Sequence, residues 1–172
     1  TPSEFRGSRS DLMWTPPPRQ IELSSSDQNL SRALIARFGD ALKPADSTSD
    51  MLTLEVADER LADVLRYLKH EATPKYQRLD DLTAIDESAR RHPENYPDFT
   101  MVYHLLSYDA ASRIRLTVPL NGKSPGITSI TGIWPSANWY EREVFDLMGI
   151  HFHGHQNLQS GPWQYLLSVT CA

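Results

Sequence analysis

The stretch that decides the fold is FTMVYHLLSYDAASRIRLTV, at positions 99–118. Its first half, Phe99–Tyr108, is rich in aromatic and aliphatic residues, which predicts a strand. Its last part, Arg113–Val118, alternates polar and aliphatic residues, as a strand with one buried face does. The short turn Asp109–Ser112 joins the two parts. The stretch therefore predicts an antiparallel β-hairpin.

Two more strands and two helices are expected before this hairpin. Met51–Val56 alternates enough for a strand, and Tyr76–Ile85 is predicted as another. Asp27 is placed to cap a helix that Gly39 ends. Asp58 opens a second helix, whose buried face is Leu61, Val64, Leu65 and Leu68. This order of elements predicts an α+β fold, a two-layer α/β domain with a mixed β-sheet.

Composition excludes several classes of protein. The net charge of −5 over 172 residues argues against a general nucleic-acid-binding protein, whose surface is basic. Cys171 is the single cysteine, so the chain cannot form an internal disulfide or a cysteine-based zinc or iron–sulfur site. No apolar run approaches the roughly 20 residues that cross a bilayer, and no signal-peptide core is visible. We expect a soluble domain in a reducing compartment.

Three regions are expected along the chain. Residues 1–26 are predicted to be a flexible N-terminal arm, because Trp14–Pro18 is polyproline-like and Ser24–Ser26 is typical of a spacer. Residues 27–158 are predicted to form one domain. Residues 159–172 follow as a tail that is rich in apolar side chains.

The sequence NWYEREVFDLMGI, at positions 138–150, predicts a charged helix over Trp139–Met148. Asn138 and Glu141 have the spacing of a capping box, and Gly149 is expected as the left-handed residue that ends the helix. The expected apolar face consists of Tyr140, Val144, Leu147 and Met148.

Charged residues also follow one another on this helix. Arg142 and Asp146 are four apart and are expected to pair, with Glu143 beside them. Paired carboxylates can serve general acid–base chemistry. Here, however, Arg142 would lower their pKa values, and no nucleophile or substrate pocket is evident. We therefore favour a structural or docking role over catalysis.

The sequence HFHGH, at positions 151–155, places three histidines at alternate positions. On a strand their side chains would share one face, which is a plausible geometry for zinc. Gly154 weakens the strand, and no carboxylate lies close behind the histidines to orient their rings. We favour a polar strand end followed by a turn at Gly154–His155, and keep a metal site as the alternative.

The segment WPSANWYEREVFDLMGI, at positions 134–150, closely resembles the C subunit of NADH:quinone oxidoreductase (respiratory complex I), the family of the mitochondrial 30 kDa subunit. The matching signature is Glu-Arg-Glu at 141–143, an acidic residue at Asp146, two large apolar residues at 147–148 and a histidine-containing turn at His155. Upstream, 99–107 is similar to the central strand of the family, and 79–82 to the strand before it. The resemblance covers Leu30–Leu158 and is greatest to bacterial members, including those in which the C and D subunits are fused.

This resemblance implies a non-redox subunit of the peripheral arm that braces the quinone-proximal module, where electron transfer from NADH to quinone is coupled to proton translocation. No catalytic residue, cofactor or metal is expected in the chain; NADH, FMN, iron–sulfur clusters and quinone would belong to the assembly. The implied partners are the D subunit of complex I and neighbouring iron–sulfur subunits, without nucleic acid. Membrane contact would come only through the assembly, on the cytoplasmic side of the bacterial inner membrane or the matrix side in a mitochondrion. The expected interface and structural residues are Trp134, Asn138, Trp139, Glu141, Arg142, Glu143, Asp146, Gly149 and His155.

Other interpretations stay open at this point. The basic segment that the family has after Leu158 is replaced by Gln159–Trp163, so the tail at 159–172 is atypical. Membrane-bound hydrogenases and formate hydrogenlyases contain similar domains, and the sequence separates them weakly. A stand-alone metal-dependent hydrolase would use the three histidines at 151, 153 and 155.

Overall fold

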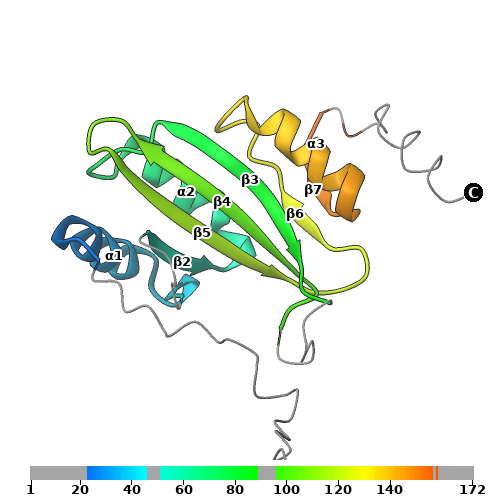
Figure 1. Ribbon diagram of the computed structural model, residues 1–172, viewed down its shortest axis with the longest axis horizontal. Helices are drawn as coiled ribbons and strands as arrows, with labels where there is room; N and C mark the ends of the chain where they lie inside the picture. Colours follow the sequence, from blue (N-terminus) through cyan, green and yellow to red (C-terminus); the bar gives the residue numbers. More distant parts are fainter. Residues whose placement is uncertain (1–22, 46–50, 89–95, 157, 159–172) are drawn as a thin grey trace, which may run out of the picture.

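The computed structural model describes residues 23–45, 51–88, 96–156 and 158 (Figure 1). Positions 1–22 of the predicted arm and positions 159–172 of the predicted tail lie outside these residues. The elements in chain order are α1 Ser25–Phe38, the 3₁₀ turn η2 Gly39–Ala41, β1 Leu42–Pro44, β2 Leu52–Val56, the 3₁₀ turn η3 Asp58–Arg60, α2 Leu61–His70, β3 Arg78–Asp86, β4 Phe99–Ser107, β5 Ser112–Leu120, β6 Gly126–Thr128, α3 Ala137–Met148 and β7 His151–His153.

The main sheet has five strands in the order β1-β2-β5-β4-β3. Strand β5 pairs antiparallel with β4 and parallel with β2, so the predicted hairpin and the predicted mixed sheet are both confirmed. Strands β1 and β3 form the two edges and pair antiparallel with their neighbours. The α+β fold class is likewise confirmed. Strand β1, which has three residues, was not predicted.

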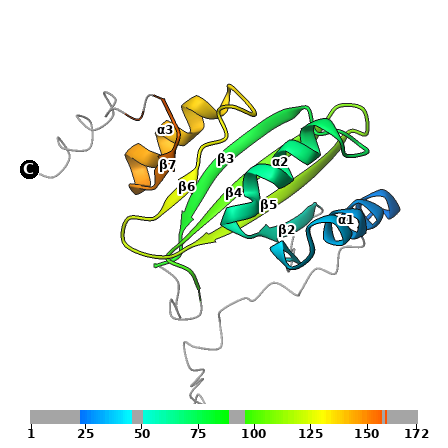
Figure 2. The same cartoon turned by 180° about the vertical axis from the view of Figure 1, so that it is seen from behind.

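Among the described residues, helix α2 covers one face of the sheet, and no helix covers the other. Helix α2 crosses the covered face, behind the sheet in Figure 1 and in front of it in Figure 2. Its predicted apolar face is buried as expected and packs in one core with inward residues of the central strands. The inward residues of β4 and β5 that are fully buried include Met101, Tyr103, Leu105, Ile114 and Leu116. On the opposite face the strands carry half-buried or exposed residues such as His104, Arg113 and Arg115.

Helix α1 begins earlier than predicted, and its cap differs. Ser24, rather than Asp27, is the capping residue: the Ser24 hydroxyl oxygen accepts from the Asp27 N–H at 3.1 Å and donates to the Asp27 carboxylate at 2.7 Å. A serine with an acidic residue three positions on is the spacing of a capping box, so both residues belong to the helix start. The predicted spacer at Ser24–Ser26 is therefore wrong. Gly39 ends the helix, as predicted, with a φ of 57°.

The third helix lies beyond one edge of the main sheet. In both views α3 runs beside β3, together with the two-stranded sheet formed by β6 and β7 (Figures 1 and 2). The Tyr140 hydroxyl donates to the Asp80 backbone carbonyl of β3 at 3.2 Å. Val144 and Leu82 are both buried at this junction. The third helix therefore covers the β3 edge, which would otherwise be open to pairing with another strand.

Candidate functional site

A buried carboxylate holds α3 against the loop that precedes it. Glu141 is fully buried. Its two carboxylate oxygens accept hydrogen bonds from the Ile130 backbone N–H and the Ser129 hydroxyl, both at 2.7 Å. The Ser129 hydroxyl also lies 2.9 Å from that of Thr131. The carboxylate thus replaces the backbone partners that this turn lacks.

His155 lies on the other side of the same carboxylate. Its Nε2 atom is 4.0 Å from a Glu141 oxygen and 3.3 Å from the Asn138 carbonyl, and its side chain is fully buried. Burial raises the pKa of Glu141, while the hydrogen bonds from Ile130 and Ser129 and the nearby His155 act in the opposite direction. The residue pair joins three segments: the loop before α3, the helix itself, and the turn after β7.

This arrangement corrects the predicted capping box. The helix begins at Ala137, with Ser136 at the cap position and no side-chain capping bond, so Asn138 lies within the first turn. Glu141 points into the core instead of back toward Asn138, because buried donors upstream of the helix compete for its carboxylate. The predicted end is confirmed: Gly149 adopts a left-handed conformation with a φ of 70°.

The predicted Arg142–Asp146 pair is also absent from the described part of the chain. Both Asp146 carboxylate oxygens are buried there without a hydrogen-bond partner. The buried residues of α3 are Ala137, Glu141 and Val144, and the predicted Tyr140 and Met148 pack against the core while partly buried. Leu147, predicted to be part of the apolar face, is 58% exposed. Because Glu141 occupies the centre of the inner face, Leu147 is turned toward its margin.

The two tryptophans near α3 have opposite roles. Trp134 is only 4% exposed; its indole N–H donates to the Gln77 carbonyl at 3.0 Å, and the Lys69 ammonium lies 5.3 Å from its ring centre. It therefore anchors the loop before α3 to the rest of the domain. Trp139 is 72% exposed on the outer face of the helix. Glu143 and Leu147 follow it at intervals of four residues, and both are exposed.

The three histidines of the 151–155 run do not converge. His151 and His153 are exposed on β7, while Phe152 between them is buried. His155 is buried against Glu141, after the turn at Gly154. Within the described ranges no group of three histidine, cysteine, aspartate or glutamate side chains is close enough to hold a metal ion.

A row of polar side chains crosses the open face of the sheet, and the sequence interpretation missed it. The Arg115 Nε–H donates to His104 Nε2 at 2.8 Å, and His104 Nδ1 lies 3.6 Å from the Asp81 carboxylate. Because Nε2 accepts a bond, the neutral ring carries its proton on Nδ1, toward the carboxylate. These residues lie opposite one another in register on β5, β4 and β3. The hairpin register alone would have placed His104 opposite Arg115.

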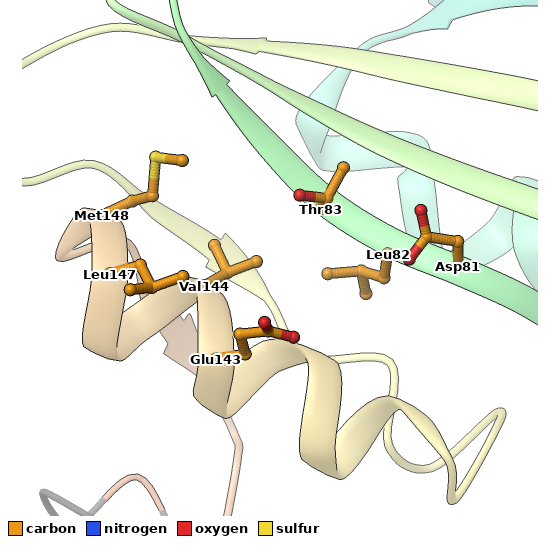
Figure 3. Close-up of a pocket in the computed structure, with 7 residues that line it drawn as sticks. All are labelled: Asp81, Leu82, Thr83, Glu143, Val144, Leu147 and Met148. Carbon is orange, nitrogen blue, oxygen red and sulfur yellow. The ribbon is translucent and has the colours of Figure 1, made fainter. Parts of the chain in front are cut away.

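A cavity of about 190 Å³ lies between β3 and α3 (Figure 3). Its apolar wall is formed by Leu82, Val144, Leu147 and Met148. The carboxylates of Asp81 and Glu143 stand at its sides, one from each element, and none of the described residues that line it is cationic. We call this feature the β3–α3 groove.

The family model of the 30 kDa subunit of respiratory-chain NADH dehydrogenase matches residues 54–162. The match begins within β2 and includes all later strands, the groove, Glu141 and His155. The chain belongs to this family. The resemblance seen in the sequence is thereby confirmed, and the last ten residues lie beyond the match.

The similarity to bacterial proteins supports the same family membership. The chain is 44% identical over 146 residues to the fused C/D subunit of NADH-quinone oxidoreductase from Rhodopseudomonas palustris strain BisA53, covering 81% of this chain and 25% of the relative. It is 40% identical over 151 residues to the C/D subunit from Azotobacter vinelandii, covering 86% and 25%. The chain thus spans about a quarter of the length of these relatives.

Solved structures share the fold. A trypsin-resistant fragment of Nqo5 superimposes with a TM-score of 0.62 at 28% identity, covering 75% of this chain and 98% of the fragment. A chain of the archaeal membrane-bound sulfane sulfur reductase has a TM-score of 0.65 at 18% identity, covering 80% of this chain and 76% of that one. The second likeness concerns the fold alone. No helix in the described ranges of this family member has both the length and the apolar character needed to cross a membrane.

Proposed function

We propose that this chain is a non-redox subunit of the peripheral arm of an NADH:quinone oxidoreductase. Its role is to brace the module in which electrons pass from NADH to quinone, coupled to proton translocation. Its partners are the D subunit, or the region that corresponds to it, and neighbouring iron–sulfur subunits. It contacts the membrane only through them, on the cytoplasmic side in a bacterium. NADH, FMN, iron–sulfur clusters and quinone are held by other parts of the assembly.

The observation that carries this proposal is the contrast between the two faces of α3. The inner face is fixed by the buried Glu141 and by Val144, whereas Trp139 is exposed on the outer face and Leu147 is exposed at the margin between the two faces. Large exposed apolar side chains on a rigid helix are typical of a protein interface, and tryptophan is among the residues that contribute most to binding. The membership in the 30 kDa subunit family supports a respiratory assembly as the source of the partner.

Affinity purification of the tagged full chain from its own cells tests the proposal. We expect mass spectrometry to identify the remaining NADH:quinone oxidoreductase subunits, and the eluate to oxidise NADH with a quinone acceptor. Trp139→Ala is expected to reduce the recovery of these subunits at least about tenfold without lowering the melting temperature. Tyr108→Ala is the matched control, since Tyr108 is a 59% exposed aromatic at the far hairpin turn.

Two results would contradict the proposal. One is the recovery of nickel–iron hydrogenase subunits without NADH-binding subunits, which would favour the hydrogenase-type assembly. The other is unchanged recovery with Trp139→Ala, which would exclude the outer face of α3 as the docking surface. Arg142→Glu provides a second perturbation of this helix, and we expect it to reduce incorporation as well.

A further inference from the structure

The β3–α3 groove has the size of one large side chain. An engineered cavity of about 150 Å³ is enough to hold benzene in another protein, and this groove measures about 190 Å³. Its floor is preformed, since Leu82 and Val144 are buried at 2% and 4% exposure. Leu147 stands at its margin with 58% of its surface exposed, which an incoming apolar group could cover.

The charges around the groove have one sign. The Glu143 carboxylate makes no hydrogen bond or ion pair with any residue that the structure describes. Asp81 is 48% exposed and has the His104 ring at 3.6 Å on the side of the sheet. A neutral side chain that covered the groove would remove the unpaired Glu143 carboxylate from water without compensation, and would leave Asp81 with His104 alone, which is costly. The groove therefore favours a cationic occupant.

Arginine fits both properties better than lysine. Its aliphatic stem can lie along apolar walls while its planar guanidinium donates to carboxylates on either side. The groove offers such walls at Val144 and Leu82, with Glu143 on the helix side and Asp81 on the strand side (Figure 3). Glu143 also lies in the exposed series with Trp139 and Leu147, so a partner that covers the helix also reaches the groove.

We propose that the β3–α3 groove binds an arginine side chain of the neighbouring subunit, next to an aliphatic residue that packs on Leu147. This inference rests on the proposed function, because it assumes a partner on the outer face of α3. It specifies the chemistry of the partner segment: basic and aliphatic side by side, within a surface otherwise anchored by Trp139.

Site-specific crosslinking in the assembled complex tests this inference. Thr83 is exposed and lines the groove, so it is replaced with p-benzoylphenylalanine in the tagged full chain. After irradiation and purification, mass spectrometry maps the crosslinked partner peptide. We expect an arginine within about two residues of the crosslink, since alternate residues of an extended segment share a face.

Charge reversal provides the second readout. Glu143→Arg is expected to lower the crosslink yield at least about tenfold, whereas the neutral Glu143→Gln has a smaller effect. Asp40→Arg is the matched control: it makes the same change at an exposed carboxylate in η2, which adjoins the opposite edge strand, and the yield should not change. Circular dichroism and melting curves verify that each variant is folded.

The outcomes separate the two proposals. If the respiratory subunits co-purify but the crosslinked peptide lacks an arginine, or Glu143→Arg crosslinks like the wild type, the groove inference is wrong and the proposed function stands. If no such subunits co-purify, the proposed function itself fails, and the groove inference fails with it.

Discussion

Removing the Glu141 carboxylate is predicted to destabilise the domain more than any other single carboxylate change on α3. Glu141→Ala leaves the Ile130 backbone N–H without its acceptor in a fully buried position. The Ser129 hydroxyl loses the same partner but can still pair with Thr131. The substitution also leaves a cavity beside Val144 and His155.

The expected loss of unfolding free energy is about 2–4 kcal/mol. An orphaned buried donor costs about 1–3 kcal/mol, and a truncated buried side chain adds about 1–2 kcal/mol for its cavity. Relief from burying the carboxylate offsets part of this, since burial already raises the pKa of Glu141. With a urea m-value of about 2 kcal/mol per molar, the midpoint should fall by roughly 1–2 M.

The assay is equilibrium urea unfolding of the full chain, followed by circular dichroism. Glu143→Ala is the matched control: it removes the same group from the same helix at an exposed position, and should change stability by less than about 0.5 kcal/mol. Equal midpoints for Glu141→Ala and Glu143→Ala would refute the reasoning, because the buried hydrogen bonds would then contribute nothing.

The same residue predicts a pH dependence. The folded-state pKa of Glu141 is raised above its ordinary value of 4.5, mainly by burial. The folded protein therefore holds this proton more tightly than the unfolded chain. The stabilisation from protonation is complete below pH 4.5 and is lost as the pH rises through the folded pKa. The stability of the wild type relative to Glu141→Gln should accordingly fall as the pH rises across this window; a flat or rising difference would contradict the assignment.

Three further predictions concern the surroundings of α3. Gly149→Ala should cost about 1–2 kcal/mol in unfolding free energy, because the left-handed conformation strains any side chain even where space is open; Gly132→Ala, at an ordinary backbone angle, is the control in the same denaturation assay. Tyr140→Phe should cost about 0.5–1.5 kcal/mol in thermal unfolding, because it removes the bond to β3, and no loss would mean that the bond is not formed in solution. Joint replacement of His151 and His153 by alanine should leave the zinc content of the purified chain unchanged in elemental analysis, whereas loss of stoichiometric zinc would restore the metal hypothesis.

The periodicity of apolar residues along the sequence was sufficient to predict the central sheet, but it did not predict the site around Glu141. The alternation at Arg113–Val118 identifies a half-buried strand because side-chain direction on a strand is fixed by position alone. The role of Glu141 depends on donors at Ser129 and Ile130 that become its neighbours only through the turn before α3. The sequence did contain one indication that Glu141 is buried. Ala137 lies four residues before it and Val144 three residues after it, which is the spacing of residues on one buried helix face.

The sequence analysis also failed to predict short strands, and it predicted an ion pair on α3 that does not form. Strands β1 and β6 have three residues each, too few for a period to be recognised, whereas the predicted strand end at His151 is confirmed as β7. The Arg142–Asp146 spacing permits an ion pair, but spacing alone does not decide the packing, and both Asp146 carboxylate oxygens are instead buried without a hydrogen-bond partner among the described residues. The predictions for residues 1–22 and 159–172 stay predictions.

The position of β5 at the centre of the sheet bears on how the chain folds during synthesis. Leu52 on β2 pairs with Ile114 on β5, while β3 and β4, which lie between them in sequence, are placed on the far side of β5. When the N-terminal half leaves the ribosome, it contains strand β2 and the amphipathic helix α2. The central strand β5, with which β2 pairs, has not yet been synthesised. Long-range closure of this kind is slow and leaves apolar surface exposed meanwhile. During synthesis, the first half of the domain can therefore complete its fold only after β5 has been synthesised and has joined the sheet.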